Sequence, residues 1–291
     1  SSPGTSASFR WATIYQQTFP LQFSRIQLER NLAGRTISGK TDNVLMLKLA
    51  LAEFGQGGQV KIILDSADAV TYSTVGMNDS IYLQKEGGRW NITDAPGFEQ
   101  KGPHRYGTFK EAFNHKMVFV YGTKGNKAEN EWAFNKARYD AESWYYRGNG
   151  AVDVITDKEY ATGKFANRGV ILFGNAQTNS AWNLLLSNSP IQVNRNAIKV
   201  GDKTWTGDDL AAYFIWPINN SPNTSVGVIA GTGLKGMGAA NANQYFAGGS
   251  GFPDYMVFRL NMLHDGGDAI ECAGFFDNHW QLDDKNNSVK E

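Results

Sequence analysis

Six short segments after residue 116 are apolar along nearly their whole length. Segments that do not alternate between apolar and polar residues are typical of strands buried on both faces of a sheet. The sequence therefore requires layers that cover both faces. The segments are MVFVYG (117–122), RGVILFG (168–174), LAAYFIWP (210–217), SVGVIAG (225–231), YMVFRL (255–260) and AIECAGFF (269–276).

Helical patterns alternate with these segments. A helix is predicted over about residues 128–147, and TNSAWNLLLS (178–187) predicts a second one that Thr178 could cap. AVDVITD (151–157) predicts a further strand, while the β-like run 191–205 interrupts the alternation and has no settled place. Strands alternating with helices predict, for residues 99–291, a Rossmann-like or flavodoxin-like α/β domain: a mostly parallel sheet with helices on both faces. The apolar face of the first helix consists of Ala133, Ala137, Ala141 and Trp144.

The first third of the chain has a different pattern. Residues 9–94 hold short β-like runs separated by turn residues, and Gly87-Gly88 has the spacing of a tight hairpin. Residues 1–98 are therefore predicted to form a small antiparallel, sandwich-like β domain. Residues 95–116, rich in Gly, Pro and alternating charge, are typical of a connection between domains.

Composition narrows the possible partners. The 28 Lys and Arg residues balance 28 Asp and Glu residues, so the chain lacks the basic surface that phosphate backbones require, and nucleic acid is not expected. We also expect no membrane span, because the apolar segments are too short. One cysteine, Cys272, excludes an intrachain disulfide framework and a thiolate metal cluster. The start SSPGTSAS, without Met or a signal pattern, is interpreted as a cut end.

Three of the predicted strands end in loops of small polar residues. Because ligands of open α/β sheets bind beyond the carboxyl ends of strands, these loops could converge on one crevice for a small polar ligand. The alternative is that each glycine only lets its strand turn sharply. Asp208 and Asp209 are paired carboxylates suited to acid–base work or to a cap. The candidate crevice residues are Gly122, Thr123, Asn126, Asn175, Thr178, Asn179, Asp208, Asp209, Gly231, Thr232 and Gly233.

Motifs for cofactors and for nucleophilic catalysis are incomplete. Gly231-x-Gly233-x-x-Gly236 follows a predicted strand, but no acidic residue is placed for a ribose, so we expect no dinucleotide cofactor. The chain has neither a P-loop nor a G-x-S-x-G elbow, although residues 248–252 come close to the latter. Cys272 is predicted to be a small buried hydrophobe, and no metal is expected.

Several blocks resemble the C-terminal portion of secreted bacterial proteins of the prolyl-oligopeptidase-like α/β-hydrolase family. The segments SSPGTSASFRWATI (1–14) and LERNLAGRTISGKTDNV (28–44) resemble the part that follows the hydrolase domain there. The resemblance places the catalytic Ser, acid and His of that family in a preceding domain, and no residue here matches them. The other blocks are KGPHRYGTFKEAF (101–113), FVYGTKG (119–125), ENEWAFNKARYDAESWYYRGNGAVDV (129–154), VILFGNAQTNSAW (170–182), GDDLAAYF (207–214), GVIAGTGLKGM (227–237) and AGFFDNHW (273–280).

Two functions from different classes follow. The leading hypothesis is a non-catalytic accessory module that packs against the catalytic domain of a serine hydrolase and shapes substrate access. The resemblance implies a secreted or periplasmic location. The alternative is a stand-alone protein that binds a sugar or a nucleotide. An independent hydrolase that uses Asp208 or Asp209 with His279 is a third hypothesis, so whether the chain is an enzyme stays open.

Overall fold

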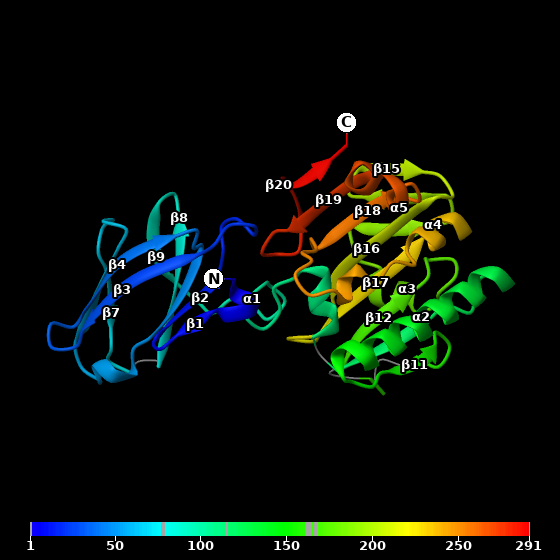
Figure 1. The fold of residues 1–291 in the computed structure, drawn as a ribbon. Coiled ribbons are helices and arrows are strands. Elements are labelled where there is room, and N and C mark those ends of the chain that lie inside the picture. Colours follow the sequence, from blue (N-terminus) through cyan, green and yellow to red (C-terminus); the bar gives the residue numbers. More distant parts are fainter. Residues whose placement is uncertain (1, 77–78, 115, 161–163, 166–167, 291) are drawn as a thin grey trace. The chain divides into compact units, whose positions relative to one another are not determined.

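The computed structural model describes residues 2–76, 79–114, 116–160, 164–165 and 168–290. The chain divides into two compact units, Ser1–Tyr106 and Gly107–Glu291, which are called unit 1 and unit 2. Figure 1 labels many of the elements of each unit. Within the described residues, no helix combines the length and the apolar character needed to cross a bilayer.

Unit 1 is built from two sheets that share one core. The first has the strand order β1-β2-β5-β8-β9 and the second β3-β4-β6-β7, in which β4 and β6 run parallel. Side chains from both sheets, among them Leu47, Leu83, Ile37 and Ile62, form one buried cluster. The elements are α1 (Pro3–Ser6), β1 (Ser8–Phe9), β2 (Ala12–Gln16), β3 (Arg25–Asn31), β4 (Thr36–Asp42), β5 (Met46–Ala50), η1 (Ala52–Phe54), β6 (Gln59–Leu64), β7 (Val70–Ser73), β8 (Ser80–Glu86) and β9 (Arg89–Thr93).

The hairpin predicted at Gly87-Gly88 is confirmed. These two residues join β8 to β9, with φ angles of 55° and 83°. A two-residue turn with positive φ at both positions matches the twist of the flanking strands, and glycine adopts it without strain.

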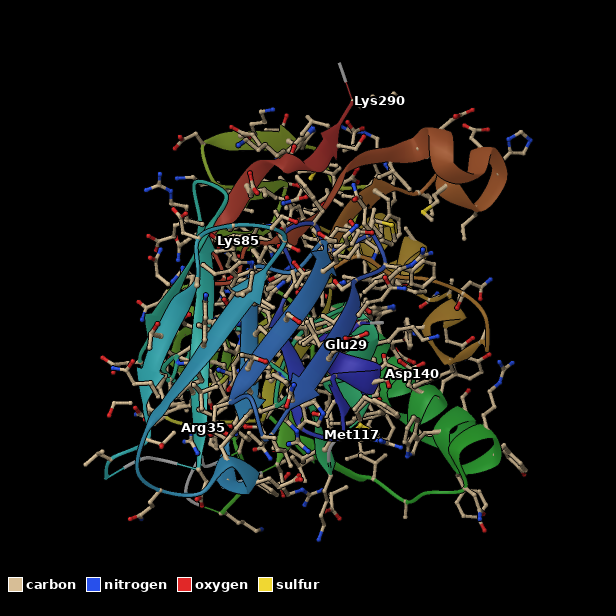
Figure 2. The ribbon with its side chains drawn as sticks, turned by 90° about the vertical axis from the view of Figure 1, so that its left-hand side faces the viewer. Glu29, Arg35, Lys85, Met117, Asp140 and Lys290 are labelled. Carbon is tan, nitrogen blue, oxygen red and sulfur yellow. The ribbon has the colours of Figure 1, made fainter. Side chains whose placement is uncertain are left out.

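Asp65 ties together three segments of unit 1. Its carboxylate accepts hydrogen bonds from the Lys85 ammonium (2.8 Å), the Trp90 indole (2.9 Å) and both the backbone and the hydroxyl of Thr41 (2.6 and 2.7 Å). Figure 2 labels Lys85 on β8. Burial alone would raise the pKa of Asp65, but these hydrogen bonds outweigh it and lower the pKa from 3.8 to about 2.

Asp65→Asn is expected to lower the free energy of unfolding of unit 1 by about 1–2 kcal/mol at pH 7. Because the folded-state pKa lies below the unfolded one, the ionised group contributes its stability above pH 4 and loses it as the pH falls toward 2. Wild type and variant should therefore converge in urea melts between pH 4 and 2. Asp68→Asn, at an exposed position nearby, is the control. A difference that does not depend on pH would contradict the prediction.

Unit 2 is organised around one large sheet, with the strand order β11-β10-β12-β17-β16-β18-β19-β20. The first four of these strands run parallel, and the other four pair antiparallel. Its strands are β10 (Met117–Tyr121), β11 (Asp153–Thr156), β12 (Gly169–Phe173), β16 (Leu210–Pro217), β17 (Ser225–Gly231), β18 (Tyr255–Arg259), β19 (Ile270–Phe276) and β20 (Leu282–Val289).

Different kinds of layer cover the two faces of this sheet. Phe109 stacks on Tyr213 of β16, with 5.4 Å between ring centroids, whereas Trp182 meets the next residue, Phe214, at 6.2 Å. Successive side chains of a strand point to opposite faces. The segments of Phe109 and Trp182 therefore cover opposite faces. The covering elements are η2 (Phe109–Phe113), α2 (Lys127–Gly148), α3 (Trp182–Leu186), β13 (Ile191–Asn194), β14 (Ala197–Val200), β15 (Lys203–Thr206), α4 (Leu234–Ala239), η3 (Gln244–Phe246), α5 (Met262–Asp265) and η4 (Gly266–Ala269).

The Rossmann-like or flavodoxin-like fold predicted for residues 99–291 is wrong. Half of the main sheet is antiparallel, and across its four sheets the chain is rich in antiparallel strands. The face beneath α3 is covered mainly by the three-stranded sheet β13-β14-β15, which residues 191–205 form, and not by a layer of helices. A β-sheet buries an apolar sheet face as well as helices do.

Two predicted helices have different outcomes. α2 is confirmed, and Ala133 and Ala137 on its predicted apolar face are buried. Asn126 and Glu129 cap its first turn reciprocally. The second helix, α3, begins only at Trp182, and Thr178 does not cap it. The Thr178 hydroxyl instead accepts a hydrogen bond from the Asn175 amide at 2.8 Å.

Candidate functional site

The three loops predicted to line a crevice do meet at the carboxyl ends of β10, β12 and β17. The Gly122 amide donates to the carbonyl of Phe173 (3.0 Å), and the Asn175 side chain donates to the carbonyl of Gly231 (2.9 Å). The Asn179 side chain donates to the carbonyls of Val120 and Phe173 (3.1 and 3.0 Å). The three loops therefore lie together, as a common crevice would require.

Most of the polar groups at this edge are already used within the chain. Asn175, Thr178, Asn179 and Thr232 are at most 1% exposed. The Thr232 hydroxyl bonds to the backbone of Leu210, and the Asn175 carboxamide oxygen accepts from the backbone amides of residues 177 and 178. Buried polar groups that are satisfied in this way join strands and leave no donors for a ligand.

A turn of the chain also covers this edge. Arg195, between β13 and β14, forms a bidentate pair with Glu129 at 2.9 and 2.7 Å. The next residue, Asn196, donates its backbone amide to the carbonyl of Thr232 (3.0 Å). Glu129 belongs to the first turn of α2. The run 191–205, which the sequence analysis left without a settled place, therefore covers the position of the predicted crevice.

The remaining predicted site residues lie in separate interactions. The Thr123 hydroxyl donates to Asp157 at 2.6 Å, and Gly233 is the residue before α4. Asp208 is paired with Lys235 at 3.1 Å, whereas Asp209 is paired with Arg259 at 2.9 Å. The two neighbouring carboxylates therefore engage different cations instead of facing a common site.

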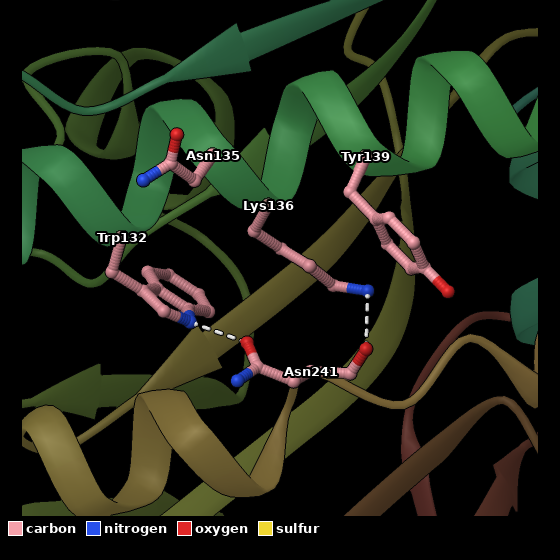
Figure 3. A pocket seen from close by; sticks show the side chains of 5 residues that line it. All are labelled: Trp132, Asn135, Lys136, Tyr139 and Asn241. Atoms are coloured by element: carbon pink, nitrogen blue, oxygen red, sulfur yellow. Dashed lines mark hydrogen bonds between the residues drawn. The ribbon is translucent and has the colours of Figure 1, made fainter.

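A different part of unit 2 forms the strongest candidate site. An open hollow of about 520 Å³ lies along α2, and Figure 3 shows it from close by. Trp132 and Tyr139, seven positions apart on the helix, flank it, and a polar loop residue lies opposite them. The lining residues are Trp132, Asn135, Lys136, Tyr139 and Asn241.

The hollow is held in shape by a buried ion pair. The Lys136 ammonium lies 2.8 Å from the carboxylate of Asp140, and both side chains are at most 2% exposed. Lys136 also donates to the carbonyls of Asn241 (3.1 Å) and Ala242 (3.4 Å), while the Tyr245 hydroxyl donates to Asp140 at 2.5 Å. Asp140 is labelled on α2 in Figure 2. This pair thus fastens the loop at 241–242 to the helix.

Burial sets the electrostatics of this pair. Removal from water lowers the pKa of Lys136 and raises that of Asp140, while their mutual attraction and hydrogen bond act in the opposite direction. Burial, with the nearby Asp140 charge, also raises the pKa of Tyr245 well above 10. The Tyr245 hydroxyl therefore remains a proton donor to the carboxylate at neutral pH.

The polar groups on the open side of the hollow have spare hydrogen-bonding capacity. Trp132 donates its indole N–H to the side-chain oxygen of Asn241 at 2.8 Å, which leaves the Asn241 amide nitrogen available. Within the described part of the chain, the side-chain amide of Asn135 and the hydroxyl of Tyr139 form no hydrogen bond. Tyr139 is 52% exposed. The site can therefore offer aromatic surface together with amide and hydroxyl groups.

Sequence reasoning missed this site, although one of its elements is visible in the sequence. Lys136 and Asp140 are four positions apart and flank the predicted apolar face of α2, where a charged pair is unexpected. The helix also carries the aromatic residues Trp144, Tyr145 and Tyr146 near its C-terminal end. Of these, Trp144 packs against Phe113, with 6.4 Å between ring centroids.

Cys272 and Ser250, the serine of the incomplete elbow at 248–252, do not line this hollow. Burial raises the pKa of the Cys272 thiol to about 12, so it is protonated at neutral pH. The Ser250 hydroxyl donates to the carbonyls of Gln244 and Ala247, at 2.7 and 2.9 Å. Neither group is positioned as an activated nucleophile.

No model of a known protein family matches the chain, and no curated protein sequence matches it significantly.

Proposed function

We propose that unit 2 binds a hydroxyl-rich ligand, a sugar, in the hollow on α2. The observation that carries this proposal is the pair of aromatic side chains, Trp132 and Tyr139, beside amide groups with hydrogen-bonding capacity that the described residues leave unused. Aromatic faces bury the C–H surface of a sugar ring, and amides pair with its hydroxyl groups.

The charge of the hollow favours a sugar over a nucleotide. Its lining includes one cation, Lys136, and that ammonium is already bonded to Asp140 and to two carbonyl groups. A phosphate is normally held by free Lys or Arg groups or by backbone amides at a helix N-terminus. Here the N-terminus of α2 is already capped by Asn126 and Glu129.

The site is organised before any ligand arrives. Trp132 is held by its bond to Asn241, and the backbone of Asn241 is held by the buried Lys136. Side chains that are already fixed lose little conformational entropy on binding, so a small contact area can still support specific recognition.

The test is a titration of the full chain with glucose, galactose, N-acetylglucosamine and their β-linked disaccharides, followed by tryptophan fluorescence and calorimetry. Trp132→Ala is expected to weaken binding at least about tenfold, which corresponds to about 1.4 kcal/mol. Tyr146→Ala, which removes an 85% exposed ring from the same helix, is the matched control and should leave the affinity unchanged.

Two results would count against a sugar site on α2. One is binding of AMP or ATP with no response to any sugar. The other is sugar binding that Trp132→Ala and Tyr139→Ala both leave intact, because the ligand would then occupy another part of the molecule.

The accessory role beside a serine hydrolase, with its secreted or periplasmic location, remains a proposal of its own. One observation favours it: Phe19, Leu21 and Phe23 expose 43%, 81% and 78% of their surface on the segment between β2 and β3. Exposed apolar side chains in one short segment are typical of surfaces that contact another protein.

The accessory role predicts that the isolated chain does not turn over p-nitrophenyl esters or aminoacyl-arylamides. Turnover that is abolished by a substitution at one residue of this chain, such as Asp209 or His279, would contradict it.

A further inference from the structure

A second hollow of unit 2, of about 220 Å³, is lined almost entirely by apolar side chains. Four of its residues, Tyr213, Ala239, Met256 and Phe258, are less than 8% exposed. We call it the β18 pocket. Its lining residues are Tyr213, Ala239, Ala242, Gln244, Phe252, Met256, Phe258, Met262 and Leu263.

The strand directions explain why this pocket exists. Parallel strands need crossover connections, which usually add a covering helix, whereas antiparallel neighbours need none. Met256 of β18 lies opposite Tyr213 of β16 in the antiparallel part of the sheet. This part is covered by the loop segments around η3 and by the short helix α5, which leave space between them.

The walls of the pocket are fixed by hydrogen bonds that leave its interior apolar. The Tyr213 hydroxyl donates to the carbonyls of Ala240 and Ala242, each at 3.1 Å. Its polar group is therefore satisfied, and its ring packs 5.0 Å from that of Phe258 and 6.3 Å from that of Phe252. Next to these rings, the pairing of β18 with β19 shifts register between Val257 and Phe258. Such irregularities re-aim side chains and are frequent next to binding sites.

We propose that the β18 pocket binds a single aromatic ring that carries a polar substituent. A dry apolar cavity of about 150 Å³ is sufficient to hold benzene, so this pocket has room for one ring and a small substituent. Aromatic and methionine side chains, as here, make favourable contacts with ring faces and edges. Gln244 is exposed at the rim, and its side-chain amide has no hydrogen-bond partner among the described residues, so it can pair with the substituent.

This site is independent of the sugar site on α2. The two share no lining residue, although the neighbouring residues Asn241 and Ala242 belong to one hollow each. A failure of either proposal therefore leaves the other intact.

The experiment uses the full chain labelled with ¹³C at the methionine methyl groups. It is titrated with phenol, as a free ring, and with N-acetyl-tyrosinamide, as the same ring on a peptide. Saturable shifts are expected at Met256 and Met262, and Met46 of unit 1 and Met117 of β10 serve as references. A response to phenol alone identifies a small-molecule site, whereas a response to the tyrosinamide as well identifies a site that also accepts an aromatic side chain.

Two variants test the location. Ala242→Phe fills the pocket and should weaken phenol binding at least about tenfold. Leu263→Asp changes a side chain that is 65% exposed, so folding should be preserved while a charge at the rim weakens binding. Leu184→Asp, at a 55% exposed position on α3, is the matched control. The proposal is overturned by an absence of saturable shifts up to about 10 mM phenol, by equal shifts at all methionines, or by affinities that neither pocket variant changes.

Discussion

Lys136→Met is expected to lower the free energy of unfolding of unit 2 by about 3–5 kcal/mol, because it leaves the buried carboxylate of Asp140 without its cation. Tyr245 still donates one hydrogen bond to that carboxylate, but a neutral donor does not compensate a buried charge. The substitution also removes the bonds to the carbonyls of residues 241 and 242. The loop opposite α2 should therefore loosen.

The double variant Lys136→Met/Asp140→Leu should recover much of this loss. Replacing both partners of a buried pair by apolar residues of similar size is often close to neutral, since neither charge must then be desolvated. Arg138→Met is the matched control on the same helix: it breaks an exposed pair with Glu142 at 3.6 Å and should cost less than about 1 kcal/mol.

The pH dependence gives a second readout of Lys136→Met. Burial raises the pKa of Asp140, so in a folded chain without Lys136 this group binds its proton more tightly than in the unfolded chain. Stability then falls as the pH rises through the folded-state pKa. The decrease in the free energy of unfolding caused by Lys136→Met should accordingly be smaller at pH 5 than at pH 8. Urea melts combined with hydrogen exchange of peptides from 127–148 would show this, and an equal cost in Lys136→Met and Arg138→Met would refute it.

The elements of unit 2 were more predictable than their arrangement. The helical repeat of α2 is evident because its alanines recur with helical spacing and it packs by one face. Five of the six apolar segments were correctly predicted as strands buried on both faces, whereas in the sixth, β19, buried residues alternate with partly exposed ones. Such burial is the same whether neighbouring strands run parallel or antiparallel, so hydrophobicity does not encode their direction.

Connection lengths carried information that hydrophobicity lacked. Only residues 218–224 separate β16 from β17, and a parallel crossover needs about a dozen residues or more. That spacing indicates an antiparallel pair, as the structure has it. The covering sheet β13-β14-β15 was also present in the sequence as a β-like run, but its role depends on contacts with β16 and β17 that no local pattern reveals.

The candidate site also depends on contacts between distant segments, which local sequence patterns do not reveal. The convergence of the three strand-end loops followed from a general rule for sheets, yet whether they leave a cavity depends on Arg195, which reaches Glu129 from a distant segment. The hollow on α2 likewise needs Asn241, more than a hundred positions from Trp132. Periodicity can identify a helix face, but not the loop that will lie against it.

Gly236→Ala is expected to destabilise unit 2 by about 3 kcal/mol or more, because Gly236 allows α4 to lie directly against β16. A methyl group at this position would overlap the carbonyl oxygen of Leu210 and lie 2.8 Å from its carbonyl carbon. Backbone atoms of an inner strand of a sheet cannot move aside as a flexible side chain can, so the helix would have to shift. Gly236 belongs to the motif Gly231-x-Gly233-x-x-Gly236. The first glycine of this motif, Gly231, packs against the backbone of Met237 in the same way.

Gly238→Ala is the matched control, since it lies in the same short helix with nothing within 4 Å of the added methyl group. It should be neutral or stabilise the protein by up to about 1 kcal/mol, because alanine favours a helix and restricts the unfolded chain. If Gly236→Ala lowers the free energy of unfolding no more than Gly238→Ala does, close packing does not explain the motif. A large difference would instead assign Gly231-x-Gly233-x-x-Gly236 to the contact between helix and sheet, where the same spacing otherwise indicates a dinucleotide site.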